Sequence, residues 1–162
     1  MSDDAQFLQA NMVRFERVFA ASAQQIWAVL TDIKRLPHWY GEGAIAPAVG
    51  GTVSLMAGHI RGVVTQWQPP TRLAYTSNVF MPGQTVSDYP ESYLTLDVAD
   101  GKLTLTHLPV LDRFVKQNAM GWHTYLDMVA AELKGEPPQL RAIHMARNAA
   151  HYGVDLDNVT MA

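Results

Sequence analysis

His107 is the titratable side chain best placed to act inside this protein. It follows Leu103 and Leu105 in steps of two, so the three residues share one face of a predicted strand. An imidazole on a cavity wall can donate a hydrogen bond to a ligand carbonyl, or move a proton near neutral pH. The alternative is a structural histidine that bonds to backbone near the start of the next helix.

Two tyrosines and one arginine are further candidates for ligand contact. Tyr75 shares the phase of Leu73 on its strand, and Tyr93 lies on the strand that follows. A tyrosine joins an apolar ring to a polar tip, which suits it to orient a ligand in an apolar pocket. Arg61 would hold a carboxylate if it faced inward. Plain packing of the tyrosines and simple solvation of the arginine are the alternatives.

Large apolar side chains in the expected connections are candidates for the mouth of a cavity, because such groups are costly to expose. Met81 is flexible enough to adapt to an irregular ligand, and core packing is the alternative for it and for Trp39. Trp122 lies in the middle of the last long helix. The predicted ligand-binding residues are therefore Trp39, Arg61, Tyr75, Met81, Tyr93, His107 and Trp122. No residue is assigned a catalytic role.

We expect neither a metal nor a cofactor. His144 and His151 are seven residues apart and would share a helix face, but no carboxylate completes a tetrahedral site between them. The absence of cysteine excludes disulfides and cysteine-ligated metal sites. No nucleophile elbow, zinc-protease, phosphate-loop or dinucleotide motif is present.

Composition narrows the class of partner. Charged residues make up 17% and apolar residues 48% of the 162 residues, so the apolar excess must lie in a core, a pocket lining or a subunit contact. The scarcity of charge favours a homodimer, and an apolar pocket lining would take a hydrophobic small molecule as the partner. A net charge of -3 without basic runs argues against nucleic acid. The acidic N-terminus and the lack of a long apolar run predict no secretory signal, no membrane insertion and a cytoplasmic protein.

The elements that position these residues follow from apolar periodicity and turn chemistry. Ser22 is the expected N-cap of the first helix, Asp112 is the expected N-cap of the last long one, and Asp100-Gly101 predicts a two-residue hairpin turn of type I′. The predicted strands are 12–19, 44–48, 52–56, 60–67, 72–80, 91–98 and 102–108, and the predicted helices are 23–31, 33–36, 112–134 and 140–151.

This order predicts one curved antiparallel sheet of about seven strands closed by one long helix, with an apolar cavity between the two layers. We expect a single α+β domain over 1–162, with a core at 13–134, a tail at 1–12 and a helical extension at 136–162. In that extension Leu140, Ile143, Arg147 and Ala150 follow helical spacing, so the helix should pack on its own domain or on a second copy.

Short motifs in this order resemble the helix-grip fold of the START-like, or SRPBCC, superfamily, and its branch named after the activator of the ninety-kilodalton heat-shock protein's ATPase. The motifs are RVFAAS at 17–22, IWAVLTD at 26–32, HWY at 38–40, GGTV at 50–53, GVV at 62–64, PPTRL at 69–73 and the helix 121–133. The resemblance implies a fold whose members bind lipids, sterols or polyketides, and of which a few catalyse cyclisation or dehydration.

The leading hypothesis is therefore binding of a hydrophobic or amphipathic small molecule in the cavity. One alternative is a cyclase or dehydratase in which His107 or Tyr75 moves a proton. Another is a protein-interaction module of the co-chaperone kind. The resemblance gives that second alternative little weight, because the chaperone activators carry an additional domain that contacts the chaperone and this chain has no room for it. An open polar cavity would favour the enzyme, an open apolar one the binder, and a sealed one the interaction module.

Overall fold

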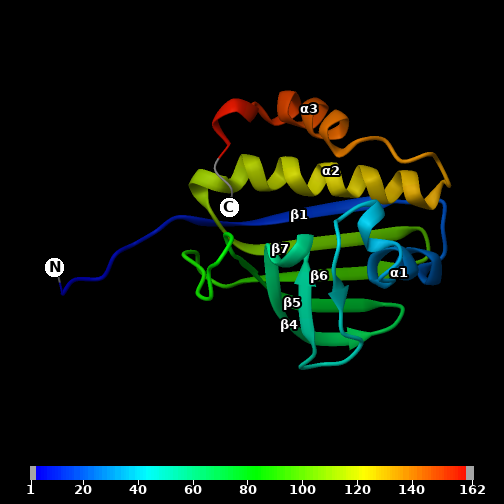
Figure 1. The fold of residues 1–162 in the computed structure, drawn as a ribbon, viewed down its shortest axis with the longest axis horizontal. Helices are drawn as coiled ribbons and strands as arrows, with labels where there is room; N and C mark the ends of the chain where they lie inside the picture. Colours follow the sequence, from blue (N-terminus) through cyan, green and yellow to red (C-terminus); the bar gives the residue numbers. More distant parts are fainter. Residues whose placement is uncertain (1–2, 160–162) are drawn as a thin grey trace.

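The computed structural model describes residues 3–159, so positions 1–2 and 160–162 of the predicted tail and extension lie outside it. Its main element is one antiparallel sheet of seven strands in the order β1-β7-β6-β5-β4-β3-β2 (Figure 1). The strands are β1 (Ala10–Val18), β2 (Ala44–Ile45), β3 (Thr52–Leu55), β4 (Ile60–Gln68), β5 (Arg72–Val79), β6 (Ser92–Ala99) and β7 (Lys102–Leu111). The predicted helix-grip architecture is confirmed.

The described residues also form three α-helices, α1 (Ala23–Thr31), α2 (Val115–Leu133) and α3 (Arg141–Tyr152). The long helix α2 runs alongside β1, and α3 lies on the side of α2 away from the sheet (Figure 1). None of the helices in the described part of the chain is long and apolar enough to cross a bilayer.

Local chemistry fixes the start of α1. The Ser22 hydroxyl accepts the Gln25 backbone N–H at 3.2 Å, and the Gln25 side chain accepts the Ser22 N–H at 2.8 Å, which forms a complete capping box. Asp100 adds a second cap by accepting the Ala23 N–H at 2.8 Å. The predicted hairpin at Asp100-Gly101 is present, but only Gly101 has a positive φ, so the turn is not type I′. The Asp100 side chain caps the N-terminus of α1.

The apolar stripe of α2 is confirmed as the face that packs on the sheet. Trp122, Leu126 and Val129 are buried along it. The expected N-cap at Asp112 is wrong, because a short 3-10 helix (Asp112–Phe114) precedes α2 and no side chain caps the α-helix. The Asp112 carboxylate accepts a hydrogen bond from Asn11 on β1 instead.

Three predicted element boundaries are also wrong. The expected helix at 33–36 is a turn followed by a 3-10 helix (Leu36–His38), because Pro37 has no N–H to continue the hydrogen bonds of an α-helix. The strand expected at 44–48 ends at Ile45, ahead of Pro47. The last strand continues past His107 to Leu111, because β1 pairs with it as far as Ala10.

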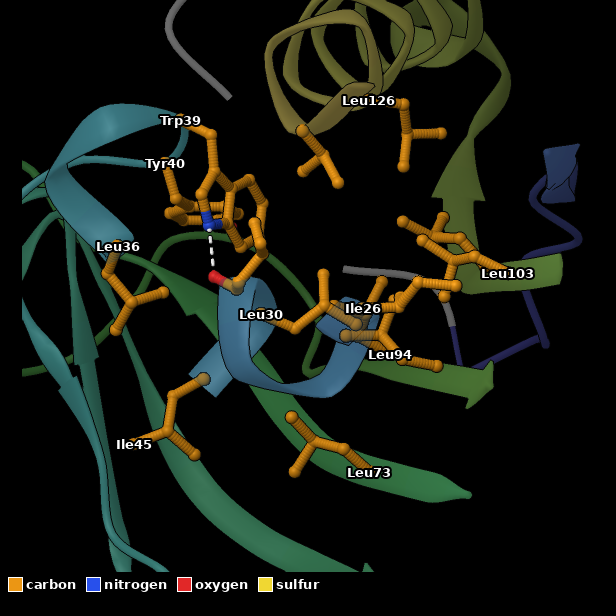
Figure 2. Packing of buried hydrophobic residues seen from close by; sticks show 14 of the residues in the cluster. Ile26, Leu30, Leu36, Trp39, Tyr40, Ile45, Leu73, Leu94, Leu103 and Leu126 are labelled. Atoms are coloured by element: carbon orange, nitrogen blue, oxygen red, sulfur yellow. Dashed lines mark hydrogen bonds between the residues drawn. The ribbon is translucent and has the colours of Figure 1, made fainter. Parts of the chain in front are cut away.

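Side chains fill the space between the sheet and α2. Figure 2 shows Trp39 and Tyr40 entering this space from the connection that follows α1, close to Leu36 and Leu30. The indole N–H of Trp39 donates to the Val29 carbonyl at 2.8 Å, drawn as the dashed line in Figure 2. The ring of Tyr40 stacks on Tyr125 with centroids 5.0 Å apart. The middle of the predicted cavity is therefore occupied by the protein's own aromatic rings.

The C-terminal helix docks on its own chain, but not through the residues that its apolar spacing suggested. His144, Asn148 and Ala149 are the buried residues of α3, whereas Leu140 and Ile143 are exposed. The Asn148 amide donates to the Thr124 hydroxyl and to the Asp127 carboxylate of α2, each at 3.1 Å. Polar contacts thus hold α3 in place and leave its apolar face to solvent.

Candidate functional site

A small pocket lies where α2 begins, at the edge of the aromatic interior. Its volume is about 70 Å³. Its polar floor comes from Ser77 on β5, Ser92 on β6, His107 on β7 and Asn118 on α2, and its apolar rim includes Val79, Tyr89, Pro90, Val110, Leu111 and Phe114. No Asp, Glu, Lys or Arg lies among the described residues that line it. The pocket thus joins convergent neutral polar groups to an apolar mouth.

Hydrogen bonds determine the tautomer of His107. The indole N–H of Trp122 lies 3.1 Å from Nδ1, and because an indole nitrogen only donates, Nδ1 must be unprotonated. The Asn118 amide nitrogen donates to the same Nδ1 at 3.1 Å. The proton of the neutral ring therefore lies on Nε2, which is 2.8 Å from the hydroxyl oxygen of Ser92. Both ring nitrogens are occupied by protein groups.

The direction of these bonds runs against nucleophile activation. The Ser92 hydroxyl donates to the Ser77 carbonyl at 2.6 Å, so its oxygen accepts a hydrogen bond from His107 Nε2 and the hydroxyl donates none to the imidazole. A serine activated by a base requires the opposite direction. Burial lowers the pKa of His107 to about 4, because the charged imidazolium loses hydration. His107 is therefore a neutral, hydrogen-bonded wall residue at physiological pH.

Asn118 supplies a buried polar atom that has no partner among the described residues. Its amide nitrogen faces His107, which turns the carbonyl oxygen Oδ1 the other way. Oδ1 is buried and accepts no hydrogen bond from the described residues. A buried acceptor without a partner costs about 1 to 3 kcal/mol, which a ligand donor at this position would recover. Oδ1 is therefore an unsatisfied acceptor next to the pocket.

Two aromatic side chains meet across the pocket mouth. The rings of Tyr89 and Phe114 pack edge to face with centroids 5.7 Å apart. Tyr89 belongs to the β5–β6 connection, whose position Arg61 fixes by donating to the Gln84 carbonyl at 2.8 Å and by covering the Phe80 ring. Arg61 thus orders the loop that forms the rim, and it does not line the pocket.

Of the seven predicted ligand-binding residues, His107 lines this pocket, and Trp122 contacts His107 without lining the pocket itself. Trp39 and Tyr75 lie in the core, and the Tyr75 hydroxyl is hydrogen-bonded to that of Tyr40. Burial raises the pKa of Tyr75, so its phenol keeps its proton. Met81 and Tyr93 are exposed and do not line this pocket.

Sequence reasoning missed three residues of the pocket floor. Ser92 shares the phase of Leu94 and Leu96, and Ser77 shares that of Tyr75, so both are polar residues on strand faces that turn inward. Asn118 precedes Trp122 by one helical turn. The sequence signal that could have identified them is a polar residue with the same strand or helix phase as buried apolar residues.

The structure contains no group of His, Asp and Glu side chains among residues 3–159 that could hold a metal ion. His144 instead accepts a hydrogen bond from Arg147 at 2.8 Å, and His151 packs against His123 and Tyr152.

A curved seven-stranded sheet closed by one long helix, with a pocket at the start of that helix, defines the helix-grip class of small α+β proteins. Within that class, the chain belongs to the family described as Activator of Hsp90 ATPase homolog 1-like proteins, whose model matches residues 20–134. The C-terminal helix α3 lies beyond the matched residues. No curated protein sequence matches the chain.

Solved structures share this fold at low sequence identity. CalU16 from Micromonospora echinospora is 19% identical, with a TM-score of 0.67 over 91% of this chain and 97% of its own. An HSP90 activator from Plasmodium falciparum is 19% identical, with a TM-score of 0.64 over 79% of this chain and 99% of its own. DynU16, from the dynemicin biosynthetic locus, is 20% identical with a TM-score of 0.67, over 80% of this chain and 50% of its own.

Proposed function

We propose that this protein binds a neutral small molecule with an apolar body and an N–H or O–H group, in the pocket at the start of α2. The observation that carries the proposal is the unpartnered Oδ1 of Asn118 in a pocket without charged side chains. The apolar rim would hold the body of the ligand, and Oδ1 would accept its proton donor. An ionised ligand would lose its hydration without gaining a counter-charge.

The same contacts favour binding over proton transfer. A general acid or base needs a nitrogen or oxygen free to exchange a proton with the substrate. His107 uses both ring nitrogens on protein groups, and Tyr75 is buried beside Tyr40 with a raised pKa. Neither residue suits the cyclase or dehydratase mechanism.

The size of the pocket limits the ligand. At about 70 Å³ it is smaller than the roughly 300 Å³ at which drug-sized sites begin. A bicyclic aromatic would therefore enter only if Tyr89 moved away from Phe114, which lies opposite it at the mouth. Tyr89 is the more movable partner because it belongs to a connection, whereas Phe114 directly precedes α2.

Calorimetric titration with indole and N-methylindole tests the proposal, since N-methylation replaces the N–H donor by a methyl group on the same ring system. We expect indole to bind about tenfold more tightly, the effect of one hydrogen bond to a buried acceptor. Asn118→Leu should abolish this preference, while Gln24→Leu, which removes an exposed amide on α1, should leave it intact. Equal affinity for both compounds in the unmodified protein would refute the assignment of Oδ1.

One observation favours a second function, a protein-interaction module. Tyr40, Tyr75, Trp122 and Tyr125 fill the space in which helix-grip ligands were expected, which is the sealed arrangement such a module would have. The measurement that decides is titration of the protein with the Hsp90-type chaperone of its own host. Micromolar or tighter binding to the chaperone, together with no binding of indole, would replace the first function by the second.

A further inference from the structure

A second cavity lies at the opposite end of α2 from the pocket. It is an open groove of about 540 Å³ between the end of β1, the C-terminal half of α2 and the connection to α3. These three segments lie at one end of the molecule in Figure 1. The volume falls within the range of small-molecule sites, roughly 300 to 1,000 Å³. Part of its wall belongs to the α2–α3 connection and α3, which the family model does not cover.

Charge in the groove is opposite in sign to that of the whole chain. Arg17, Lys134 and Arg147 line it against Asp127 and Glu136, which leaves one excess positive charge, whereas the chain carries -3. The groove would therefore favour an anion even though the protein as a whole repels one.

Two of these cations share a single carboxylate. Arg17 Nη2 lies 3.0 Å from one Asp127 oxygen, and Arg147 Nη2 lies 3.5 Å from the other. Burial opposes the ionisation of Asp127, but hydrogen bonds from Asn148 and Arg17 outweigh it and lower its pKa, so it stays charged. Arg147 has the longer contact with Asp127 and also donates to His144 Nδ1 at 2.8 Å, but its side chain is 58% exposed, against 22% for Arg17. Arg147 is thus the guanidinium available to turn toward a ligand.

The walls between the charges are apolar and include small residues. Ala130 and Ala131 on α2 line the groove between the larger side chains of Phe19 and Leu133. Methyl side chains in this position leave room for an aliphatic chain and provide the apolar surface that would stabilise it. The groove therefore offers one cationic end and one apolar surface.

We propose that this groove binds a free single-chain carboxylate, with the aliphatic chain against Ala130, Ala131 and Leu133 and the carboxylate on Arg147. Arg17 remains paired with Asp127 and adds a second positive charge close to the bound anion. Guanidinium and carboxylate groups match in geometry and form two parallel hydrogen bonds. The site is separate from the pocket at His107, and its ligand is charged where that of the pocket is neutral.

Titration of the full-length protein with dodecanoate and dodecanol tests the proposal. We expect saturable binding of dodecanoate at about tenfold or higher affinity than dodecanol, as one charge-assisted hydrogen-bonded contact implies. Arg147→Glu and Lys134→Glu should each weaken dodecanoate about tenfold or more. Lys116→Glu is the matched control, because it makes the same charge change on an exposed position of α2 far from the groove, and it should have no such effect.

Three results would overturn the proposal. The first is equal weakening by all three charge reversals, which would mean that only net charge matters. The second is loss of dodecanoate binding in Asn118→Leu, which would place the anion in the other pocket. The third is binding to vesicles of anionic phospholipid without binding of free dodecanoate, which would make the partner a membrane surface.

Discussion

The indole N–H of Trp122 donates to Nδ1 of His107 across 3.1 Å, and this contact places the proton of the neutral imidazole on Nε2. The tryptophan that packs α2 on the sheet therefore also sets the tautomer of the histidine in the pocket wall. A protonated Nδ1 would turn its N–H toward the indole N–H, so ionisation of His107 would break the contact. Packing and pocket chemistry are thus coupled through one pair of side chains.

The pKa of His107 is the first quantity that the structure predicts. It should lie near 4, which chemical-shift titration of the imidazole protons measures directly. Trp122→Phe removes the donor to Nδ1, so we expect the pKa of His107 to rise by roughly 0.5 to 1, the equivalent of one neutral hydrogen bond. A His107 that titrates near 6.5 in the unmodified protein would contradict the assigned tautomer.

Stability should fall as the pH is lowered through the acidic range. Between about pH 6.5 and 4 the unfolded chain binds a proton at His107 that the folded protein does not, so the free energy of unfolding decreases by about 1.4 kcal/mol per pH unit, or about 3 kcal/mol in total. Urea denaturation gives the free energy of unfolding of the unmodified protein and of His107→Gln at pH 7 and 4.5. The difference between the two proteins in their change with pH is the contribution of His107.

His107→Gln is the matched control for the titration of His107. Glutamine keeps a donor and an acceptor but does not titrate, so its stability should depend less on pH over this interval. His123, whose pKa burial also lowers, is present in both proteins and cancels in the difference. Identical pH dependence of the two proteins would show that His107 is not the buried neutral base.

Trp122 should be among the most costly residues of α2 to truncate. It is 5% exposed and packs against Tyr40 and Tyr125, so Trp122→Ala should reduce the free energy of unfolding by roughly 3 to 5 kcal/mol. Denaturant unfolding monitored by circular dichroism measures the loss. A cost below about 1 kcal/mol would mean that the helix stripe does not close the sheet.

The C-terminal helix should stabilise the chain that carries it. Arg141 donates to the Tyr40 carbonyl at 2.9 Å, and the Asn148 amide donates a hydrogen bond to Thr124 of α2. The helix α3 therefore contacts both the aromatic interior and the long helix. Deleting 136–162 should lower the melting temperature by about 5 °C, since roughly 2 kcal/mol is lost and each kcal/mol is worth about 2 to 4 °C at this chain length.

Homodimer formation remains a prediction, and the structure suggests its surface. Leu140 is 73% exposed and Ile143 is 52% exposed on the outer side of α3, where a second copy would cover them. Light scattering should report a dimer for the full chain and a monomer for Ile143→Glu. A monomer before and after deletion of 136–162, with an unchanged melting temperature, would rule out both the docking and the dimer.

The sequence predicts most of the fold because local signals agree with the tertiary structure. Ser22 and Gln25 mark the start of α1 through a bond between near neighbours, and the spacing of Trp122, Leu126 and Val129 marks the buried side of α2. The boundaries that failed depend on distant partners. Asp112 bonds to Asn11 on another strand, which no local pattern reveals.

The candidate site is less predictable for the same reason. Strand phase places His107 on the inner face, but the pocket exists only because Ser92, His107 and Asn118 meet from three separate elements. Trp39 was expected at a cavity mouth because it lies in a connection, yet that connection folds back into the core. Whether a connection is buried depends on packing that the sequence pattern does not describe.

The position of a bound ligand tests the central claim most directly. Nuclear magnetic resonance titration with indole should shift the side-chain amide signals of Asn118 and the ring signals of His107 saturably, while the side-chain signals of Arg147 in the groove stay unchanged. Saturable shifts confined to the groove, or no shift at Asn118 when indole is bound, would contradict the proposal that the pocket at the start of α2 is the binding site.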